Sequence, residues 1–260
     1  GDESVFATAR SAEAARRIRR TGAVPVPFDF SAPRPVGKRT RTVIHLAGIK
    51  FAPGLASLMR DCGSERAIVI SSASAVTEGH PNRESVLQGE ALLQSEKFDA
   101  AILRPTMIYG SYRERNVRRL ADACARLPAI PSIRGGGLVM PVFADDVASA
   151  IIEVFGSPGS QDPRPVGGPR PLRMGDILDS LASAAGFRRI RVTLPIDPAI
   201  RGSALLGAHG SKLVHAVQML GVDRIVSTPG EVGFEYVPTE FRHGVEVALR
   251  RYKEERSSNV

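Results

Sequence analysis

The chemical groups that suggest a function most clearly lie in residues 101–110, Ala-Ile-Leu-Arg-Pro-Thr-Met-Ile-Tyr-Gly. The apolar start of this segment is typical of a buried strand, and the proline should end the strand because it cannot continue a hydrogen-bonded ladder. The loop that follows would lie at the carboxyl edge of a sheet, where open α/β sheets bind their ligands. We therefore expect Pro105, Thr106, Met107 and Tyr109 to lie close to a bound ligand.

Short apolar runs alternate with amphipathic stretches, and these elements would position that loop. The apolar runs predict strands at residues 5–9, 23–28, 41–46, 66–70 and 99–103. The amphipathic stretches predict helices at residues 12–20, 53–61, 85–94 and 144–155. Strands that alternate with helices are typical of a parallel sheet covered on both faces. The sequence therefore predicts an α/β fold with a doubly wound parallel sheet.

The composition changes near residue 156, which suggests a second part of the chain. Residues 156–171 are rich in glycine and proline and are predicted to form a loop region. After it we expect helices at residues 172–185, 198–221 and 241–253, and a strand at residues 189–194. We therefore divide the chain into a ligand-binding domain, residues 1–155, and a small C-terminal lobe, residues 156–260.

Composition excludes several classes of protein. The 260 residues carry a net charge of +8, but the arginines spread around their helices, which favours an anionic small molecule over nucleic acid as the partner. No apolar run approaches the roughly 18 residues of a membrane span. Only Cys62 and Cys124 are present, so we expect neither disulfides nor a zinc site, and a cytoplasmic location. The five histidines show no metal-binding spacing.

Two motifs point to a known family. Residues 104–110 match the pattern Arg-Pro-x-x-x-Tyr-Gly, and residues 141–146 are similar to a Val-His-Val-Asp-Asp-Val segment, with Phe143 in place of histidine. With the order of the elements, these motifs resemble the extended short-chain dehydrogenase/reductase family, the NAD-dependent epimerases and dehydratases. The resemblance implies a Rossmann-like fold, an NAD(P) cofactor, a small-molecule substrate such as a nucleotide sugar, and a homodimer.

The resemblance also implies roles for residues at the ends of the predicted strands. Arg10 and Ser11 lie where the family contacts the adenosine ribose, and an arginine there suits a 2′-phosphate and favours NADP over NAD. The alternative is that Arg10 is a surface residue. Ser72 lies at the strand end that carries the family's catalytic serine or threonine, and Tyr109 is either a replacement acid/base or a packing residue. The other implied cofactor contacts are Asp29, Phe30, Leu46, Ala47, Gly48, Ser71, Pro105, Thr106 and Met107.

The sequence departs from the family pattern in two ways. The G-x-x-G-x-x-G turn that holds the cofactor's pyrophosphate has no counterpart, and we expect about 25–30 residues with a strand and this turn upstream of Gly1. The family's tyrosine and lysine positions fall on Asn82 and Val86, which cannot move a proton. Two hypotheses stay open: an epimerase, dehydratase or reductase with an altered acid/base, and a catalytically silent dinucleotide-binding sensor or complex-supporting protein.

The remaining acidic residues suggest no chemistry. Asp145 and Asp146 begin a predicted helix and are expected to cap it, and no metal site is expected around them. Glu84 and Glu90 lie on a predicted helix and are expected to be solvated.

Overall fold

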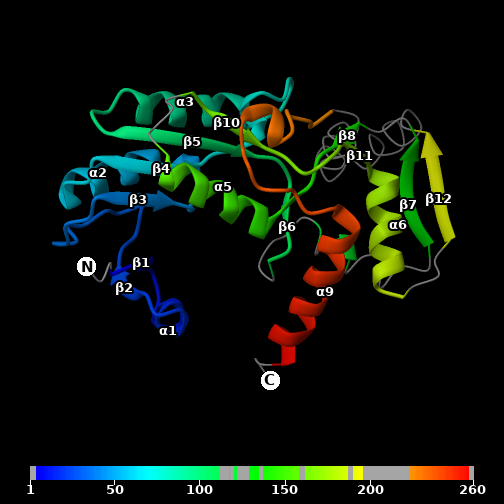
Figure 1. Cartoon of the computed structure of the whole chain (residues 1–260), viewed down its shortest axis with the longest axis horizontal. Helices are drawn as coiled ribbons and strands as arrows, with labels where there is room; N and C mark the ends of the chain where they lie inside the picture. Colours follow the sequence, from blue (N-terminus) through cyan, green and yellow to red (C-terminus); the bar gives the residue numbers. More distant parts are fainter. Residues whose placement is uncertain are drawn as a thin grey trace, which may run out of the picture. The chain divides into compact units, whose positions relative to one another are not determined.

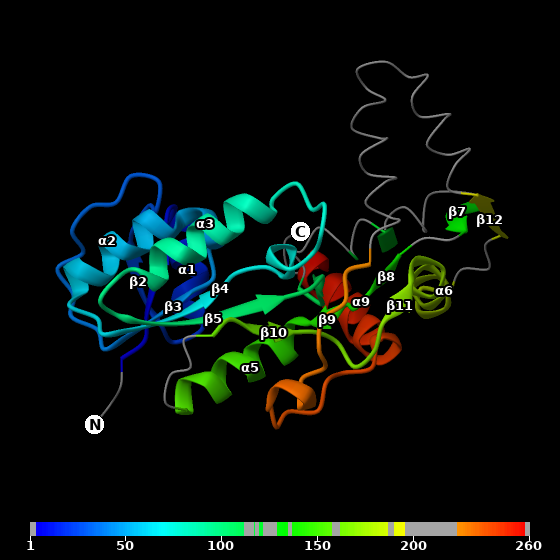
Figure 2. The same ribbon diagram turned by 90° about the horizontal axis from the view of Figure 1, so that it is seen from above.

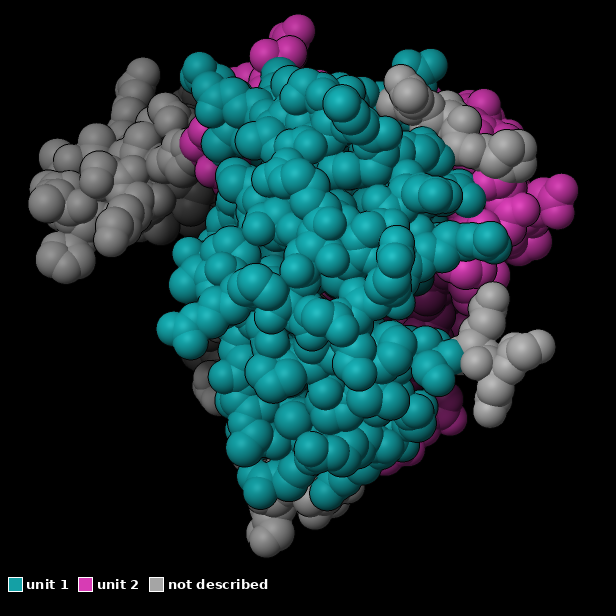
Figure 3. All heavy atoms as spheres, turned by 90° about the vertical axis from the view of Figure 1, so that its left-hand side faces the viewer, with its two compact units in different colours: residues 1–71, 84–102, 159–163 teal, residues 72–83, 103–158, 164–260 magenta. Residues whose placement is uncertain are grey.

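The computed structural model describes residues 4–111, 117, 120–121, 129–134, 137–157, 162–186, 190–195 and 223–257 (Figure 1 and, from above, Figure 2). The chain divides into two compact units. The first contains residues 1–71, 84–102 and 159–163, and the second contains residues 72–83, 103–158 and 164–260 (Figure 3). The domain boundary predicted after residue 155 stays a prediction.

Short strands joined by helices build the first unit. β1 (Phe6–Ala9) pairs in parallel with β2 (Val24–Pro27), and β3 (Thr42–His45) pairs in parallel with β4 (Arg66–Ile70), which lies beside β5 (Asp99–Pro105). The connecting helices are α1 (Ala12–Arg20), η1 (Ile49–Phe51), α2 (Ala52–Cys62), and α3 (Arg83–Gln94). The α/β fold with parallel strands is therefore confirmed.

The strands form more than one sheet. β1 and β2 make a sheet of two, and a second sheet has the order β10-β5-β4-β3, where β10 is Arg164–Val166. Among the described strands, no backbone pairing joins β1 to β3. The strand and glycine-rich turn expected upstream of Gly1 stay a prediction.

β5 is longer than the sequence predicted. It continues to Pro105, which lies opposite Val166 of β10 in a parallel pair. Thr106 N donates the next hydrogen bond, to Val166 O at 3.0 Å. Because successive backbone N–H groups of a strand point to opposite sides, the N–H that Pro105 lacks would point away from β10, and the pairing with β10 keeps its donors.

The second unit contains three more pairs of short strands. β6 (Ile108–Tyr109) and β9 (Val142–Phe143) are parallel, as are β7 (Ala129–Arg134) and β12 (Ile190–Pro195), whereas β8 (Leu138–Val139) and β11 (Leu172–Arg173) are antiparallel. The helices are η2 (Ala73–Ala75), α5 (Ala144–Gly156), α6 (Met174–Ala184), η3 (Gly230–Val232) and α9 (Phe241–Ser257). No helix in the described part of the chain is long and apolar enough to cross a membrane.

Most predicted elements agree with the structure within one or two residues. The helix predicted at 172–185 begins only at Met174, because the two residues before it pair with β8 as a strand. The final helix continues beyond the predicted residue 253 to Ser257. The helix predicted at 198–221 lies outside the described residues.

The core of the second unit gathers around α6 and α9. Leu181 and Ile177 of α6 and Val245 of α9 are fully buried in one cluster with aromatic side chains. Burial of such side chains contributes about 1.5–3 kcal/mol each relative to exposure. This cluster gives the strand ends of the second unit a rigid support.

Two carboxylates of α5 hold α9 and the residue Thr239 that precedes it. Asp146 accepts hydrogen bonds from Thr239 N and Thr239 Oγ1, both at 2.8 Å. Asp145 binds Arg251 through two contacts of 2.7 and 2.9 Å. The expectation that these aspartates cap their own helix is confirmed for Asp146, whose carboxylate also accepts from the backbone N–H of the N-cap residue Phe143. The contacts with residues about a hundred positions later were not predicted.

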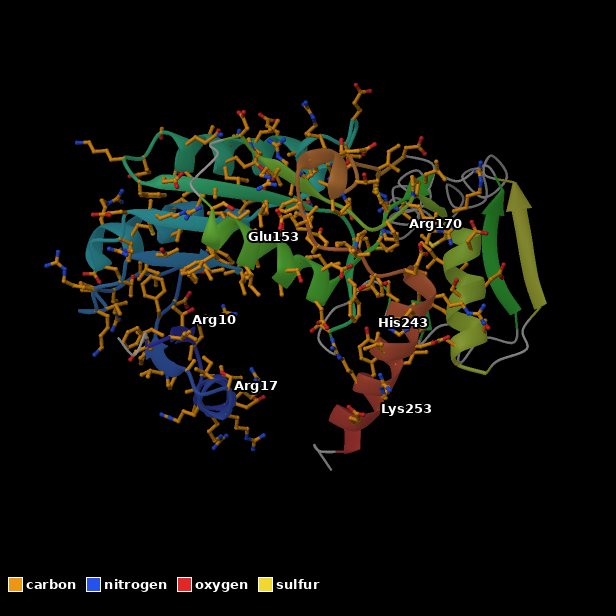
Figure 4. The ribbon with its side chains drawn as sticks, viewed as in Figure 1. Arg10, Arg17, Glu153, Arg170, His243 and Lys253 are labelled. Carbon is orange, nitrogen blue, oxygen red and sulfur yellow. The ribbon has the colours of Figure 1, made fainter. Side chains whose placement is uncertain are left out.

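Glu153 on the same helix fixes this segment at a second point (Figure 4). Its Oε2 accepts from Glu235 N at 2.9 Å and its Oε1 from Tyr236 N at 2.7 Å. Each carboxylate oxygen therefore accepts a hydrogen bond from a backbone N–H. Removing the carboxylate would leave these two N–H groups without this acceptor and would lower the free energy of unfolding.

We expect Glu153→Gln to lower the free energy of unfolding by about 1–3 kcal/mol, because the amide would keep one acceptor and oppose the second backbone N–H with a donor. Urea denaturation measures this change. The matched control is Glu246→Gln, whose carboxylate forms only an exposed pair with Arg242 at 3.8 Å and should change stability by less than about 0.5 kcal/mol. Equal effects of the two substitutions would contradict the role of Glu153.

Candidate functional site

A cavity of about 290 Å³ lies where β1 meets α1 in the first unit. Arg10, Ser11, Arg19 and Pro25 are among the residues that line it. The sequence predicted Arg10 and Ser11 here but not Arg19, which comes into the cavity because it lies on the turn of α1 that faces β2. The cavity is therefore lined by two arginines, Arg10 before the N-terminus of α1 and Arg19 in its last turn.

The charge in this cavity is not neutralised by the protein. Arg17 pairs with Glu13 at 2.5 Å, whereas neither Arg10 nor Arg19 has an acidic partner among the described residues (Figure 4 labels Arg10 and Arg17). Ser11, which also lines the cavity, caps α1 by accepting from Ala14 N at 3.1 Å. Two unpaired cations and a helix N-terminus favour an anion.

The loop after β2 is shaped by local packing. Asp29 Oδ1 accepts from Ser31 N at 2.9 Å, which closes the turn. The Phe30 ring packs edge-on against Phe28 and His45, with ring centroids 4.9 and 4.8 Å apart. The predicted adenine contacts of Asp29 and Phe30 stay predictions, and the structure shows that Phe30 also contributes to the core.

The loop after β3 depends on a buried histidine. His45 is 1% exposed, and its Nε2 lies 3.1 Å from Gly48 O. Burial lowers the pKa of His45, so the neutral ring is favoured. Gly48 has a φ of +90°, a conformation that favours glycine, and Leu46 is 66% exposed. The ring therefore positions the segment in which Leu46, Ala47 and Gly48 were predicted to contact the cofactor.

The end of β4 carries a buried polar pair. Ser71 Oγ donates to Glu90 Oε1 at 2.5 Å, and the Glu90 side chain on α3 is 2% exposed. The expectation that Glu90 is solvated was therefore wrong. Sequence reasoning could not find this partner because the two residues are 19 positions apart and meet only when α3 packs against the sheet.

Ser72 belongs to the second unit, and its hydroxyl is also engaged. Ser72 Oγ accepts from Ser74 N at 3.2 Å and from Ser74 Oγ at 2.8 Å. Ser72 Oγ is the acceptor in both contacts, so its own hydroxyl hydrogen can still be donated to a ligand. Ser74 was not among the predicted site residues and acts here as the donor that orients Ser72.

The loop after β5 is tied to its neighbours. Thr106 Oγ1 donates to Met140 O, and Met107 O accepts from Val142 N at 3.0 Å. Because the threonine hydroxyl already donates to the backbone, it is left mainly as an acceptor for a ligand. The predicted contacts of Pro105, Thr106 and Met107 with a cofactor stay predictions.

Tyr109 is fully buried. Its ring packs against Phe143 and Phe241 with centroids 5.4 and 4.9 Å apart, and its hydroxyl lies so close to Gly244 that a Cβ there would overlap it. Burial, with a smaller contribution from the charge of Asp146, raises the pKa of Tyr109, which disfavours phenolate. This geometry favours the packing alternative, and catalysis by Tyr109 stays a prediction.

The positions that the resemblance assigns to tyrosine and lysine differ in their surroundings. Asn82 precedes the first residue of α3, and its backbone N–H donates to His80 Nδ1 at 3.2 Å. Val86 lies inside α3 and is 6% exposed. Neither side chain titrates, so the proton-transfer pair of the family has no equivalent at these two positions. In the described part of the chain, no group of three or more His, Cys, Asp or Glu side chains could hold a metal ion.

We expect Ser71→Ala to lower the free energy of unfolding by about 1–3 kcal/mol, because it removes the donor that faces the buried Glu90 carboxyl. Glu90→Gln should lower the free energy of unfolding by less than Ser71→Ala does, since the amide oxygen can still accept from Ser71. The control is Ser95→Ala, whose hydroxyl donates to Leu92 O at an exposed site and should contribute less than about 0.5 kcal/mol. Thermal or urea unfolding measures all three, and a neutral Ser71→Ala variant would contradict the pairing.

The comparisons with known proteins establish the fold. No protein-family model matches the sequence, and no curated protein does. Among solved structures, the chain is similar to gox2253 at 17% identity and a TM-score of 0.75, covering 97% of this chain and 90% of that one. It is also similar to triphenylmethane reductase from Citrobacter sp. (15% identity, TM-score 0.70, 94% and 90% covered) and to DesIV, a dTDP-glucose 4,6-dehydratase from Streptomyces venezuelae with NAD bound (14%, 0.72, 99% and 90%). The chain therefore has the Rossmann-like α/β fold of these structures, as its sequence motifs predicted.

Proposed function

We propose that the chain is an NADP(H)-binding protein of the extended short-chain dehydrogenase/reductase type. The observation that carries this proposal is the β1–α1 cavity with its two unpaired arginines, Arg10 and Arg19. In this fold the carboxyl end of a strand followed by a helix N-terminus is the place where nucleotides bind. The similar solved structures add support, because DesIV contains NAD and triphenylmethane reductase has been solved with NADP(H).

The residues of the cavity fit the 2′-phosphate of NADP. A guanidinium can bind two phosphate oxygens at once, and two such groups would neutralise a dianion. Ser11 and the first turn of α1 add hydrogen-bond donors on the same side. When bound, the nicotinamide would supply hydride chemistry, while Asp29, Phe30, and the loop of Leu46, Ala47 and Gly48 would hold the adenosine and the rest of the dinucleotide.

Catalysis by the family's usual route is not part of the proposal. Asn82 and Val86 cannot relay a proton, and the buried Tyr109 is a poor base because its hydroxyl is held in an apolar core. The chain would therefore bind the dinucleotide, with Ser72 as the available hydroxyl on the substrate side. A catalytically silent sensor or complex-supporting protein is the second candidate, and the buried Tyr109 favours it. A nucleotide-sugar substrate, a homodimer and a cytoplasmic location stay predictions.

We expect Arg10→Ala to reduce the preference for NADPH over NADH by about tenfold to a hundredfold, which corresponds to the loss of one charge-assisted pair with the phosphate. Arg19→Ala should act in the same direction. Fluorescence titration of both nucleotides measures the ratio of the two affinities. Arg17→Ala is the control, because Arg17 already pairs with Glu13 and does not line the cavity. An unchanged ratio in Arg10→Ala would make Arg10 a surface residue.

We expect the turnover rate with NADP⁺ and a panel of nucleotide sugars to be zero or very low. General acid–base catalysis usually contributes about 10²–10⁴-fold, so the rate should lie below that of an enzyme of this type with an intact acid/base by about this factor. Nicotinamide absorbance and product stereochemistry measure it, with nucleotide binding as the positive control. Tyr109→Phe should leave any residual rate unchanged. Rapid turnover that survives Tyr109→Phe would show that another group acts as the base, and a large loss in this variant would assign that role to Tyr109.

A further inference from the structure

The helix α1 carries two arginines whose charge the protein does not neutralise. Arg16 and Arg20 are exposed, and their spacing of one turn places them on the same face of the helix. Neither has an acidic partner in the described part of the chain, whereas Arg17 of the same helix pairs with Glu13. Like charges at this spacing repel each other, so the pair does not stabilise α1. Figure 4 shows nitrogen-tipped side chains around this helix, where Arg17 is labelled.

Uncovered aliphatic side chains lie at the end of the β1–β2 pair where α1 ends. The helix runs back along the two parallel strands, from the end of β1 to the start of β2, and Arg20 is its last residue. At the start of β2, Val24 N donates to Val5 O at 2.8 Å, so these two valines are neighbours. Val5 is 66% exposed and Val24 is 45% exposed. The last turn of α1 and two uncovered valines therefore share one edge of the first unit.

A phenylalanine and a lysine complete this surface. Phe6, the first residue of β1, is 36% exposed and lies beside Val24 in the register of the two strands, so both side chains are on the same face of the pair. Nζ of the exposed Lys38 lies over the Phe6 ring, 5.7 Å from its centroid. The name basic edge is used below for Val5, Phe6, Arg16, Arg20, Val24 and Lys38.

The composition of the basic edge favours one class of partner. Nucleic-acid surfaces of this kind usually add aromatic rings on which bases stack, but the ring of Phe6 lies beneath the Lys38 ammonium. An acidic peptide would pair with the cations and would leave the valines uncovered. An anionic bilayer attracts the cations to its headgroups, and aliphatic side chains can enter the boundary between headgroups and acyl chains. A bilayer surface therefore matches both the charge and the apolar groups of the edge.

We propose that the basic edge binds the surface of an anionic lipid bilayer, with its cations at the headgroups and its valines inserted below them. Arg16, Arg20 and Lys38 supply three positive charges, and each cation close to an anionic membrane raises the affinity about fivefold. The inference goes beyond the proposed function and does not depend on it, because neither Arg16 nor Arg20 lines the cavity between β1 and α1.

Sedimentation with lipid vesicles tests the proposal in the intact chain. Vesicles that mix phosphatidylserine with phosphatidylcholine should bind the protein, and vesicles of phosphatidylcholine alone should bind it weakly. We expect Arg16→Gln/Arg20→Gln to reduce the affinity for the mixed vesicles about 25-fold, the product of two contributions of about fivefold. The matched control is Arg170→Gln/Arg242→Gln, which removes the same charge from two exposed, paired arginines of the second unit. This control should change the affinity by less than about twofold, because charges that do not contact the bilayer are screened by salt.

The apolar and charged groups of the edge can be tested separately. Val5→Ser should reduce the affinity about tenfold because it removes an aliphatic side chain from the interface, whereas Val237→Ser, at an exposed valine of the second unit, should leave it unchanged. Salt at about 1 M, where the screening length is about 3 Å, should abolish binding. Arg16→Lys/Arg20→Lys should keep the affinity within about threefold, since the bilayer responds to charge more than to the geometry of the guanidinium group.

The proposal would be overturned by a wild type that does not bind the mixed vesicles, or by equal losses in Arg16→Gln/Arg20→Gln and its control. A loss in the lysine variant as large as in the glutamine variant would also overturn it, and would indicate a bidentate site for a single phosphate. Preferential binding of poly-glutamate or single-stranded RNA would assign the edge to an acidic peptide or a nucleic acid instead. Circular dichroism checks folding, and if the glutamine variant does not fold, the salt dependence and Val5→Ser decide the question. Titration of NADPH against the wild type tests the proposed function separately.

Discussion

Buried polar groups need partners, and this requirement determines where the loops of the protein lie. Ser71 at the end of β4 is held by Glu90 of α3, and Asp146 and Glu153 of α5 hold backbone and side-chain donors of residues 235–239. Each of these contacts joins segments that are far apart in the sequence. The Ser71–Glu90 contact is buried and those of Asp146 are half-buried, and removing one partner of a buried pair costs more than the bond itself contributes. The strand ends are therefore fixed by a few polar pairs in addition to apolar packing.

Two buried polar atoms that have no hydrogen-bond partner among the described residues, Tyr109 Oη and Arg224 Nε, differ in charge. The hydroxyl of Tyr109 has no hydrogen-bond partner, but it is uncharged and lies against Gly244 in an aromatic core, so packing accounts for it. The same reasoning cannot account for Arg224, because its guanidinium carries a charge in a half-buried place. A buried neutral group without a partner costs less free energy than a buried ion without one, and Nε is the buried atom of Arg224 that lacks a partner in the described part of the chain.

In the proposed function, cofactor binding and proton transfer depend on different residues of this chain. The proposed binding site has a cavity lined by Arg10 and Arg19, which have no acidic partner in the described part of the chain, and ordered loops after β3, β4 and β5. The elements of proton transfer are replaced by Asn82 and Val86. Binding depends on backbone shape and charge, which many sequences provide, whereas proton transfer depends on one titrating group at one place. The proposed function therefore combines dinucleotide binding with a lack of titrating groups at these two positions.

Local sequence patterns determined the elements of this protein, because strand and helix periodicity depends on neighbouring residues. The strands at residues 5–9, 41–46 and 66–70 and the helix at 12–20 follow from such patterns and agree with the structure within one residue at each end. The strand through Pro105 extended further than the proline suggested, since its pairing with β10 involves residues about sixty positions away. Burial of Glu90, the place of Arg19 in the cavity wall and the half-buried position of Arg224 were decided only by tertiary structure. A partner, or the lack of one, is a property of residues brought together in space, and no local pattern records it.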